Sequence, residues 1–254
     1  GIMRFNLPVL VYQEKNCVHN HADEIAQMGK NALIVTGRNS SKKNGSLDDV
    51  INALKSKNIK YTVYDGVEEN PSVETVMEAR EIGVKAGCDF IIGIGGGSPM
   101  DAAKAIGVMI YHKNENKDFL YKSVSNSQSL PVIEVPTTCG TGSEVTTVAV
   151  LTVHNEKTKK SMSHRIFPRM ALVDEKYIKN APLKVICDTA IDALAHIVES
   201  CINNNATEYS KMFAKEGLEA WSKFKDVLLG NREATDEDFH NMMYASTLAG
   251  MCIA

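Results

Sequence analysis

Two side chains that could share a metal ion lie four residues apart in the segment "DTAIDALAHIVES", residues 188–200. They are Asp192 and His196, and the segment has the apolar periodicity of a helix. On a helix, residues four apart project from the same face. A carboxylate and an imidazole both bind divalent metals well, but two ligands make only half of a site. Chance gives such a pair in a chain of this composition about one time in three, so its meaning depends on its surroundings.

A glycine-rich loop, "GIGGGSPMD", joins an apolar run to the start of a predicted helix. Gly95, Gly96 and Gly97 allow positive φ angles and let a ligand approach the backbone closely. Their N–H groups and the following helix N-terminus attract an anion, and Ser98 could cap the helix or donate to a phosphate oxygen. The loop is neither a Walker A motif nor a standard G-x-G-x-x-G. A tight turn is the alternative, but three consecutive glycines exceed its needs, so we predict a phosphate site.

A second polar loop, "PTTCGTGSE", follows the apolar run "LPVIEV" and places four hydroxyl groups among two glycines. The hydroxyls belong to Thr137, Thr138, Thr141 and Ser143. Taken alone, this segment could be an ordinary loop. Beside the glycine loop, it is predicted to form the other wall of a nucleotide cleft.

A third loop, "TGRNSSKKNG", follows the apolar run "NALIV", where a dinucleotide fold reads the adenosine ribose. NAD-selective proteins usually place an acid there, whereas NADP-binding proteins use basic and hydroxyl side chains for the 2′-phosphate. No acid lies between residues 36 and 47. The loop offers instead Gly37, Arg38, Ser40, Lys42 and Lys43. A solvated basic loop is the alternative interpretation, but the pattern favours NADP(H) over NAD.

The elements that must position these loops alternate along the first 180 residues. Apolar runs typical of buried strands alternate with amphipathic helical segments, which indicates a parallel sheet covered on both faces. We predict strands in the segments 8–13, 31–37, 60–67, 89–97, 130–138, 146–155 and 169–177, and helices in the segments 21–29, 46–58, 72–87 and 98–112. Ser46 is predicted to be the N-cap of the second of these helices, and Ser72 is predicted to begin the third.

After residue 180 the periodicity is helical throughout. The predicted fold class is therefore an α/β dinucleotide-binding domain at residues 1–180, followed by the start of an all-helical metal and substrate domain at residues 181–254. The last helical pattern still runs at Ala254, with no glycine C-cap, terminal basic residue or proline. We therefore expect that the chain is cut within this helix.

The bulk composition excludes several classes of protein. A net charge of -3 and a pI of about 6.2 give no electrostatic case for nucleic acid or an anionic membrane as a partner. No apolar run approaches the roughly 18 residues of a membrane span, and no signal peptide is evident. We expect a cytoplasmic protein. Its six cysteines form no CxxC pair, which indicates free thiols and not a disulfide framework or a cysteine zinc site.

The motifs "GGGSPMD", "PTTCGTGSE" and "DALAH", in this order and with these gaps, resemble the iron-containing (group III) alcohol dehydrogenases. The likeness covers the chain from about "PVLVYQEK" to its last residue. The loop "TGRNSSKKNG" is most similar to the NADPH-dependent butanol dehydrogenase and aldehyde reductase branch. The resemblance implies a dinucleotide-binding domain, a helical domain, and a cleft between them for metal and substrate. A homodimer is a family-level expectation.

The resemblance assigns roles to individual residues. It implies a pyrophosphate loop of Gly95, Gly96, Gly97, Ser98 and Asp101, and a threonine loop of Thr137, Thr138 and Thr141. It implies an adenosine-side contact at Asn70, a ribose contact at Lys160 or, as the second choice, Lys159, and NADP(H) selection at Gly37. Asp192 and His196 match the first two metal ligands. The family's other two ligands are histidines that follow the motif matched by "LAGMCIA", and His164 and His240 match neither. The chain thus resembles the N-terminal two-thirds of such an enzyme.

The implied metal is Fe²⁺, with Zn²⁺ as a substitute, acting as a Lewis acid on an alcohol or aldehyde oxygen. Hydride would pass between NADP(H) and a primary alcohol or aldehyde, and we assign no side chain as a general base. Two alternatives stay open. One is a lyase similar to dehydroquinate synthase, which uses NAD and a metal but returns its NAD unchanged. The other is a non-catalytic nucleotide-binding fragment.

Overall fold

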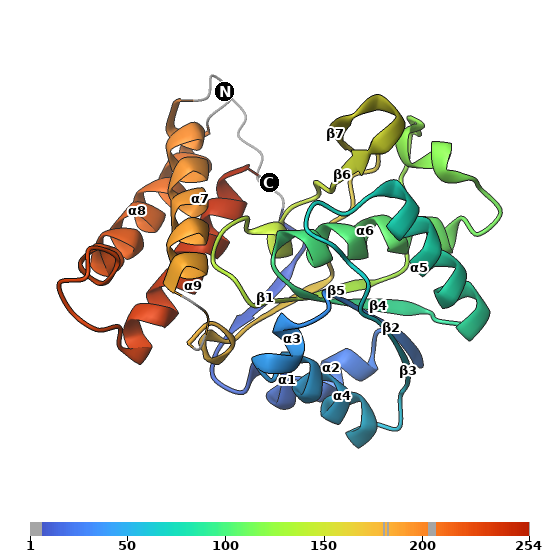
Figure 1. Cartoon of the computed structure of the whole chain (residues 1–254), viewed down its shortest axis with the longest axis horizontal. Coiled ribbons are helices and arrows are strands. Elements are labelled where there is room, and N and C mark those ends of the chain that lie inside the picture. Colours follow the sequence, from blue (N-terminus) through green and yellow to red (C-terminus); the bar gives the residue numbers. More distant parts are fainter. Residues whose placement is uncertain (1–6, 180, 182, 203–206, 254) are drawn as a thin grey trace.

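The core of the protein is a six-stranded parallel sheet with the strand order β1-β8-β5-β4-β2-β3 (Figure 1). The computed structural model describes residues 7–179, 181, 183–202 and 207–253. The strands are β1 (Leu10–Gln13), β2 (Asn31–Thr36), β3 (Lys60–Tyr64), β4 (Phe90–Gly95), β5 (Val132–Pro136) and β8 (Met170–Val173). The predicted parallel α/β sheet is therefore confirmed.

Helices cover both faces of this sheet, as the continuous apolar strands require. Every residue of β4 is buried, because its alternate side chains enter two different cores. One face is covered by α5 (Val73–Ala86) and α6 (Gly97–Tyr111), and beyond them lies the 3-10 helix η1 (Lys117–Tyr121). The other is covered by α1 (Cys17–Asn20), α2 (Ala22–Ala26) and α4 (Ser46–Ser56), and the short α3 (Ser40–Lys43) precedes α4.

The strand order reverses between β2 and β4, which are neighbours in the sheet. From β2 the chain passes outward to β3, whereas from β4 it passes to β5 on the other side. The loops that leave β2 and β4 therefore diverge and leave a crevice at the carboxyl ends of the strands, where open α/β sheets bind ligands.

Two of the predicted strands have a different arrangement from the rest. The segment 146–155 contains β6 (Val150–Val153), which pairs antiparallel with β7 (Thr158–Ser161) in a separate hairpin. All four residues of β7 are exposed, so this strand has no apolar face to bury in the main sheet. The segment 169–177 contains β8, which inserts between β1 and β5.

The two serines predicted at helix starts have different outcomes. Ser72 caps α5, because its side chain accepts a hydrogen bond from the N–H of Thr75. Ser46 is instead the first residue of α4, and the cap position is Gly45 with a φ angle of 84°. Its hydroxyl donates to Asn44 Oδ1 at 2.6 Å, which explains why it does not cap the helix.

Three helices follow the sheet, namely α7 (Leu183–Ile202), α8 (Glu208–Leu228) and α9 (Asp236–Ile253). They pack on one another and lie to one side of the sheet (Figure 1). Helix α9 also contacts the 3-10 helices η2 (Ser143–Val145) and η4 (Glu175–Tyr177). Another short 3-10 helix, η3 (His154–Glu156), connects β6 to β7. Within the described residues, no helix is both long and apolar enough to cross a membrane.

Three of the cysteines, Cys17, Cys88 and Cys139, are buried free thiols, as predicted. The side chains of Cys187 and Cys201 lie outside the described residues.

Candidate functional site

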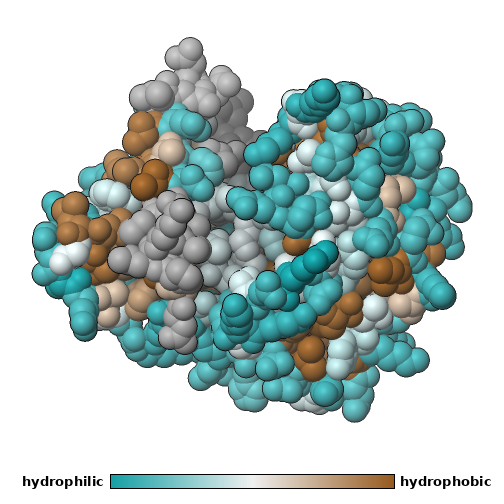
Figure 2. Space-filling model, in the orientation of Figure 1, coloured by the Kyte–Doolittle hydropathy of each residue, from teal (hydrophilic) through white to brown (hydrophobic). Residues whose placement is uncertain are grey.

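A cleft of about 530 Å³ opens at the carboxyl ends of the central strands. The glycine loop, the threonine loop, the segment 67–71 and the β6–β7 hairpin line it, and Asp192 of α7 reaches it from the helical part. Figure 2 shows a hollow between the helical part and the α/β part on this face, with hydrophilic residues along its rim on the α/β side. Gly37 and Ser40 of the loop after β2 also line the cleft, so the three loops singled out in the sequence meet in one place.

The glycine and threonine loops touch so closely that side chains on the glycines would collide with the threonines. A Cβ atom at Gly97 would lie 2.7 Å from Thr141 Cγ2, and one at Gly96 would lie 3.2 Å from Thr138 Oγ1. Gly95 has a φ angle of 141°, which favours glycine. Helix α6 begins at Gly97, so the N–H groups of its first turn and its positive dipole end face the cleft.

Gly95 and Thr137 are buried behind the lining of the cleft and do not form its surface. The N–H of Thr137 donates to the carbonyl oxygen of Gly95 at 2.9 Å, which continues the pairing of β4 with β5. Both residues hold the two loops in register. Thr138, Thr141, Gly96, Gly97 and Ser98 form the accessible wall.

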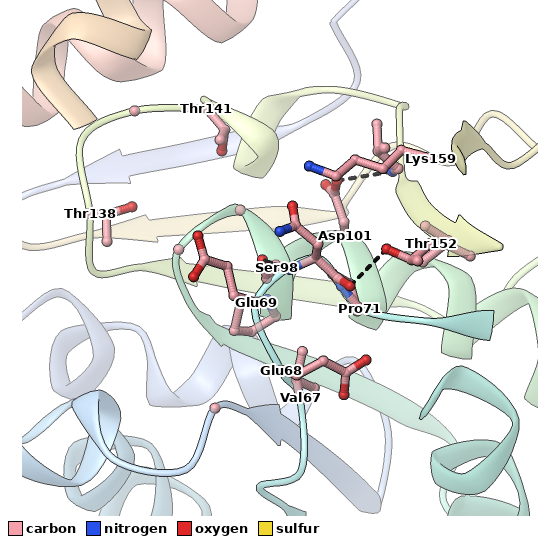
Figure 3. A pocket seen from close by; sticks show the side chains of 18 of the residues that line it. Val67, Glu68, Glu69, Pro71, Ser98, Asp101, Thr138, Thr141, Thr152 and Lys159 are labelled. Atoms are coloured by element: carbon pink, nitrogen blue, oxygen red, sulfur yellow. Dashed lines mark hydrogen bonds between the residues drawn. The ribbon is translucent and has the colours of Figure 1, made fainter. Parts of the chain in front are cut away.

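Asn70 is held beside the glycine loop by two hydrogen bonds. Its N–H donates to Ser98 Oγ at 3.1 Å, and its carbonyl oxygen accepts a hydrogen bond from Thr152 Oγ1 at 3.0 Å (Figure 3). Its φ angle of 55° is one that asparagine tolerates better than most residues. Ser98 is therefore engaged with Asn70 and does not cap α6, whose N-cap is Gly96.

Asp101 lines the cleft but is also bound to the threonine loop. Ser143 Oγ donates to its carboxylate at 2.6 Å, and the N–H of Val150 donates to it at 3.0 Å. Burial raises the pKa of Asp101, and the nearby ammonium of Lys104 opposes this rise. The carboxylate therefore joins α6 to both the threonine loop and β6.

Lys104 is a fully buried cation beneath the cleft that the sequence analysis did not single out. Its ammonium donates to Ser143 Oγ at 2.8 Å, to Thr146 Oγ1 at 3.2 Å and to the carbonyl oxygen of Val148 at 3.0 Å. Burial lowers its pKa, whereas Asp101, Glu134 and Glu144 raise it. The available signal was its spacing of three residues from Asp101, which places both on one face of α6.

Glu134 of β5 is fully buried near Lys104, and neither of its carboxylate oxygens has a hydrogen-bond partner. Burial raises its pKa well above the usual value, with Lys104 opposing the rise. A Cβ atom at Gly93 of the neighbouring strand would lie 2.2 Å from Glu134 Oε2, so the carboxyl group fills the space that Gly93 leaves.

At the predicted adenosine end, Gly37 and Ser40 line the cleft, whereas Arg38 is exposed outside the lining. Lys42 pairs with Asp65 at 2.6 Å. The hydrogen bond from Lys42, assisted by Arg38, lowers the pKa of Asp65. The basic loop thus faces an acid that follows β3.

Two further acids line the cleft that the sequence analysis did not consider, Glu68 and Glu69. Glu68 accepts hydrogen bonds from the N–H of Ser72 at 2.6 Å and from Thr75 Oγ1 at 2.7 Å, so its charge supports the start of α5. Glu69 extends towards the glycine loop in Figure 3. Both acids follow β3, outside the loop after β2 in which the sequence predicts the cofactor-selecting residues.

The structure separates the two candidate lysines. Lys159 lines the cleft, whereas Lys160 does not. The ammonium of Lys160 lies 4.8 Å from the centre of the Tyr121 ring and 3.9 Å from Glu156. Neighbouring residues of a strand point to opposite faces, so only one of the two can face the cleft. The geometry supports Lys159, the second choice, in place of Lys160.

Asp192 and His196 lie one turn apart on α7, as the sequence predicts. Asp192 is exposed to the cleft, and His196 is half-buried with an Nδ1 atom that is buried and has no hydrogen-bond partner. An exposed carboxylate beside an unsatisfied imidazole is a donor set that suits a divalent metal. Among the residues that the structure describes, no third histidine, cysteine or acid completes a cluster with this pair.

The other histidines considered in the sequence are engaged elsewhere. His164 is buried, with Nε2 2.7 Å from the carbonyl oxygen of Phe119. The ring of His240 lies 4.0 Å from Glu175, and its carbonyl oxygen accepts a hydrogen bond from Gln13. Neither side chain lines the cleft.

Comparisons with known proteins find similar sequences and similar folds. The model of a family described as iron-containing alcohol dehydrogenase matches residues 8–175. The NADPH-dependent butanol dehydrogenase of Clostridium saccharobutylicum is 32% identical over 260 residues, covering 100% of this chain and 65% of that protein. A long-chain primary alcohol dehydrogenase of Thermoanaerobacter ethanolicus is 33% identical over 87% of this chain and 56% of its own length. The chain thus spans between about half and two-thirds of these relatives.

Solved structures share the fold. The crystal structure of an iron-containing alcohol dehydrogenase from Thermotoga maritima superposes with a TM-score of 0.92 at 38% identity, covering 99% of this chain and 69% of that one. The crystal structure of a 1,3-propanediol oxidoreductase superposes with a TM-score of 0.90 at 29% identity, covering 100% and 66%.

Proposed function

Because the chain belongs to the iron-containing alcohol dehydrogenase family, we propose that it takes part in metal-dependent hydride transfer between NADP(H) and a primary alcohol or aldehyde. The observation that supports this most is the cleft itself. It brings the glycine loop, the threonine loop and Asp192 together at the carboxyl ends of parallel strands. We also propose that residues 1–180 and 181–254 act as a dinucleotide-binding domain and a metal-binding domain.

In this proposal the backbone of Gly96 and Gly97 binds the cofactor pyrophosphate, and Gly95 sets the turn that exposes it. Ser98, Thr138 and Thr141 donate hydroxyl hydrogen bonds from the two walls. Asn70 contacts the adenosine side, and Lys159 contacts the ribose next to the nicotinamide. Thr137 and Asp101 keep the walls in place through their bonds to Gly95 and Ser143.

We propose a preference for NADP(H) over NAD from the residues that lie at the adenosine end of the cleft. Gly37 carries no side chain there, and Arg38 and Ser40 lie beside it to meet a 2′-phosphate. A Cβ atom at Gly37 would meet only Val67 O at 3.5 Å, an ordinary contact, so a side chain is tolerated. The carboxylate of Glu68 accepts hydrogen bonds from Ser72 and Thr75, which fix its position at the start of α5.

A substitution at Gly37 tests the choice of cofactor directly. Gly37→Asp should weaken NADPH binding at least about tenfold and strengthen NADH binding, because the carboxylate repels a 2′-phosphate and accepts a hydrogen bond from a 2′-hydroxyl. Fluorescence titration of each cofactor measures both constants. Gly45→Asn is the control, at a site where an added Cβ meets nothing within 4 Å and where asparagine tolerates the φ of 84° better than most residues. An unchanged ratio of the two constants would place the 2′-position elsewhere.

Asp192 and His196 would hold the metal on α7. When bound there, Fe²⁺ or its substitute Zn²⁺ supplies Lewis-acid polarisation of the substrate oxygen. The other residues named bind and orient the cofactor, and orientation of the two reactants is a large part of the rate gain in hydride transfer. We assign no general base among the described side chains.

The test of this function follows NADPH and NADH oxidation after anaerobic loading with Fe²⁺ and addition of butyraldehyde. In a chain of the relatives' full length, we expect aldehyde-dependent oxidation, faster with NADPH. Asp192→Asn should lower it by more than about a hundredfold, because a lost metal ligand costs more than an outer-shell partner, and should leave NADPH binding unchanged. Turnover that survives in Asp192→Asn would contradict the metal assignment. Cofactor that is bound but never consumed would instead favour a lyase or a non-catalytic binding protein.

A further inference from the structure

A second cluster of metal-binding side chains lies in the turn that follows β1. The ligand atoms of Glu14, Cys17 and His21 all lie within 4.8 Å of one another. Cys17 is fully buried, the His21 side chain is mostly buried, and the Glu14 side chain is 45% exposed. None of the three lines the cleft. The cluster therefore combines an inner thiol with an outer carboxylate that solvent can reach.

The backbone of this turn is fixed before any ion binds. The N–H of Glu14 donates to the carbonyl oxygen of Val173 at 3.1 Å. Asn16 adopts a left-handed conformation with a φ angle of 57°, and its N–H donates to Asp174 Oδ2 at 2.8 Å. Helix α1 then begins at Cys17. Both ends of the turn are thus anchored to β8 and to the residue after it, which reduces the entropic cost of gathering the ligands.

The imidazole of His21 is held in one orientation by its neighbours. Its ring stacks on Tyr12 with 3.6 Å between the ring centres. Its Nε2 atom faces the carboxylate of Glu14, while its Nδ1 atom lies 2.6 Å from Glu24 Oε2. A carboxylate on the second nitrogen is the usual outer-shell support of a metal-bound histidine, since it fixes the tautomer and raises the basicity of the ligating nitrogen.

We propose that Glu14, Cys17 and His21 Nε2 bind a divalent ion of the Zn²⁺ or Co²⁺ type, with Glu24 as the outer carboxylate and solvent at the fourth position. Thiolate, imidazole and carboxylate together suit Zn²⁺, whereas Mg²⁺ and Ca²⁺ require oxygen ligands. Ligand atoms that share a tetrahedral zinc ion lie about 3.5 Å apart. The widest spacing in the cluster therefore contracts by roughly 1 Å, and the Glu14–His21 contact opens to admit the ion from the exposed side.

The position of the cluster indicates a structural role. The same turn contacts the helical part, because Gln13 Nε2 donates to the carbonyl oxygen of His240 and Lys15 pairs with Asp236 at 3.5 Å. An ion that fixes the turn would stabilise the folded chain by mass action. Its loss would loosen the contact between β1 and α9 without touching the cleft.

The thiolate gives this site a spectroscopic signature that the Asp192–His196 pair does not have. Co²⁺ added to the anaerobic 254-residue protein should produce a thiolate-to-cobalt charge-transfer band in the near ultraviolet. The band should disappear in Cys17→Ser and persist in Cys88→Ser, because Cys88 is a buried thiol that belongs to no ligand cluster among the described residues. It should also persist in the double variant Asp192→Ala/His196→Ala. These results would show that the cobalt site is distinct from the metal site of the proposed function.

Two further variants keep the test decisive if Cys17→Ser fails to fold. Glu14→Gln alters an exposed side chain and should weaken Co²⁺ binding at least about tenfold, and Glu24→Gln should weaken it by about ten- to a hundredfold. Circular dichroism checks that each variant is folded. The absence of a band in the wild-type protein, a band that survives in Cys17→Ser, or unchanged affinity in both glutamine variants would overturn the proposal.

Discussion

Lys104 shows how a single buried charge can organise a binding cleft. Its three hydrogen bonds end on the threonine loop and the segment that leads to β6, while its own backbone belongs to α6. A charge with no solvent contact is tolerated only when it is paired and hydrogen-bonded. Lys104 is therefore a positioning residue that joins the glycine loop to the opposite wall.

Removal of this charge should destabilise the whole chain. Lys104→Met is expected to lower the free energy of unfolding by about 3 kcal/mol, because it leaves buried carboxylates without their cation, and to weaken NADPH binding. Urea unfolding and cofactor titration measure the two effects. Lys85→Met, an exposed lysine on α5, is the control and should change the stability by less than about 0.5 kcal/mol. A Lys104 variant as stable as the control would show that the network is dispensable.

Asp238 gives the start of α9 a defined dependence on pH. Arg232 donates to both of its carboxylate oxygens, at 2.5 and 2.7 Å, and the N–H of Thr235 donates at 2.8 Å. The Arg232 hydrogen bond holds the pKa of Asp238 below its ordinary value of 3.8. Because the pKa is depressed in the folded chain, the ion pair stabilises the chain fully above the ordinary pKa of 3.8. This stabilisation is lost progressively as the pH falls below 3.8.

Asp238→Asn should therefore be less stable than the wild type at pH 7, and the difference should shrink as the pH falls from about 4 towards 2. Urea unfolding at a series of pH values measures this convergence. Glu237→Gln, which alters the exposed neighbouring acid, should follow the wild-type curve. A constant gap between Asp238→Asn and the wild type would mean that the ion pair has no part in acid unfolding.

At the scale of elements, α9 touches the threonine loop backbone to backbone. A Cβ atom at Gly250 would lie 2.4 Å from the carbonyl oxygen of Gly142, and one at Gly142 would lie 2.5 Å from Gly250 Cα. Thr247 Oγ1 of the same helix donates to Glu144 at 3.0 Å. The wall of the cleft is therefore supported from behind by the helical part.

Gly250→Ala should push α9 away from the loop. We expect a loss of about 1–3 kcal/mol in unfolding free energy, because neither backbone segment can yield locally, together with weaker NADPH binding. Gly217→Ala is the matched control on α8, since its Cβ would meet side-chain atoms and no backbone, with Ile197 Cδ1 at 2.9 Å and Leu248 Cβ at 3.7 Å. Hydrogen exchange of residues 137–145 would report the displaced loop. An unaltered loop and unaltered binding would show that α9 does not support this wall.

The elements differ in how far their sequences specify them. The four apolar strands β2, β4, β5 and β8 could be predicted, because a continuous apolar run is typical of a strand that is buried on both faces. The β6–β7 hairpin could not be predicted. Its apolar first strand resembles a strand of the main sheet, and its exposed second strand has no hydrophobic pattern. The choice between Lys159 and Lys160 stays a prediction, and local pattern decides it poorly because a shift of one residue in a strand reverses the face.

At the scale of the molecule, the sequence predicts that the loops meet, but it predicts only some of the side chains at the cleft. Parallel strands end at one edge, so loops after β2, β4 and β5 must converge. The acids Glu68 and Glu69 lie in the segment after β3, and Lys104 lies beneath the cleft in the apolar helix α6. Their places depend on packing between segments far apart in sequence, which local patterns do not encode.

The pairing of β1 with β8 has a consequence for the order in which the chain acquires its structure during synthesis. Leu10 pairs with Met170, and β1 stands at the edge of the sheet beside β8. At ribosomal rates of about 5–20 residues per second, roughly ten to thirty seconds separate the emergence of the two strands. During that interval β1 has no partner strand in the sheet. It is therefore expected to be among the last of the six strands to take its place.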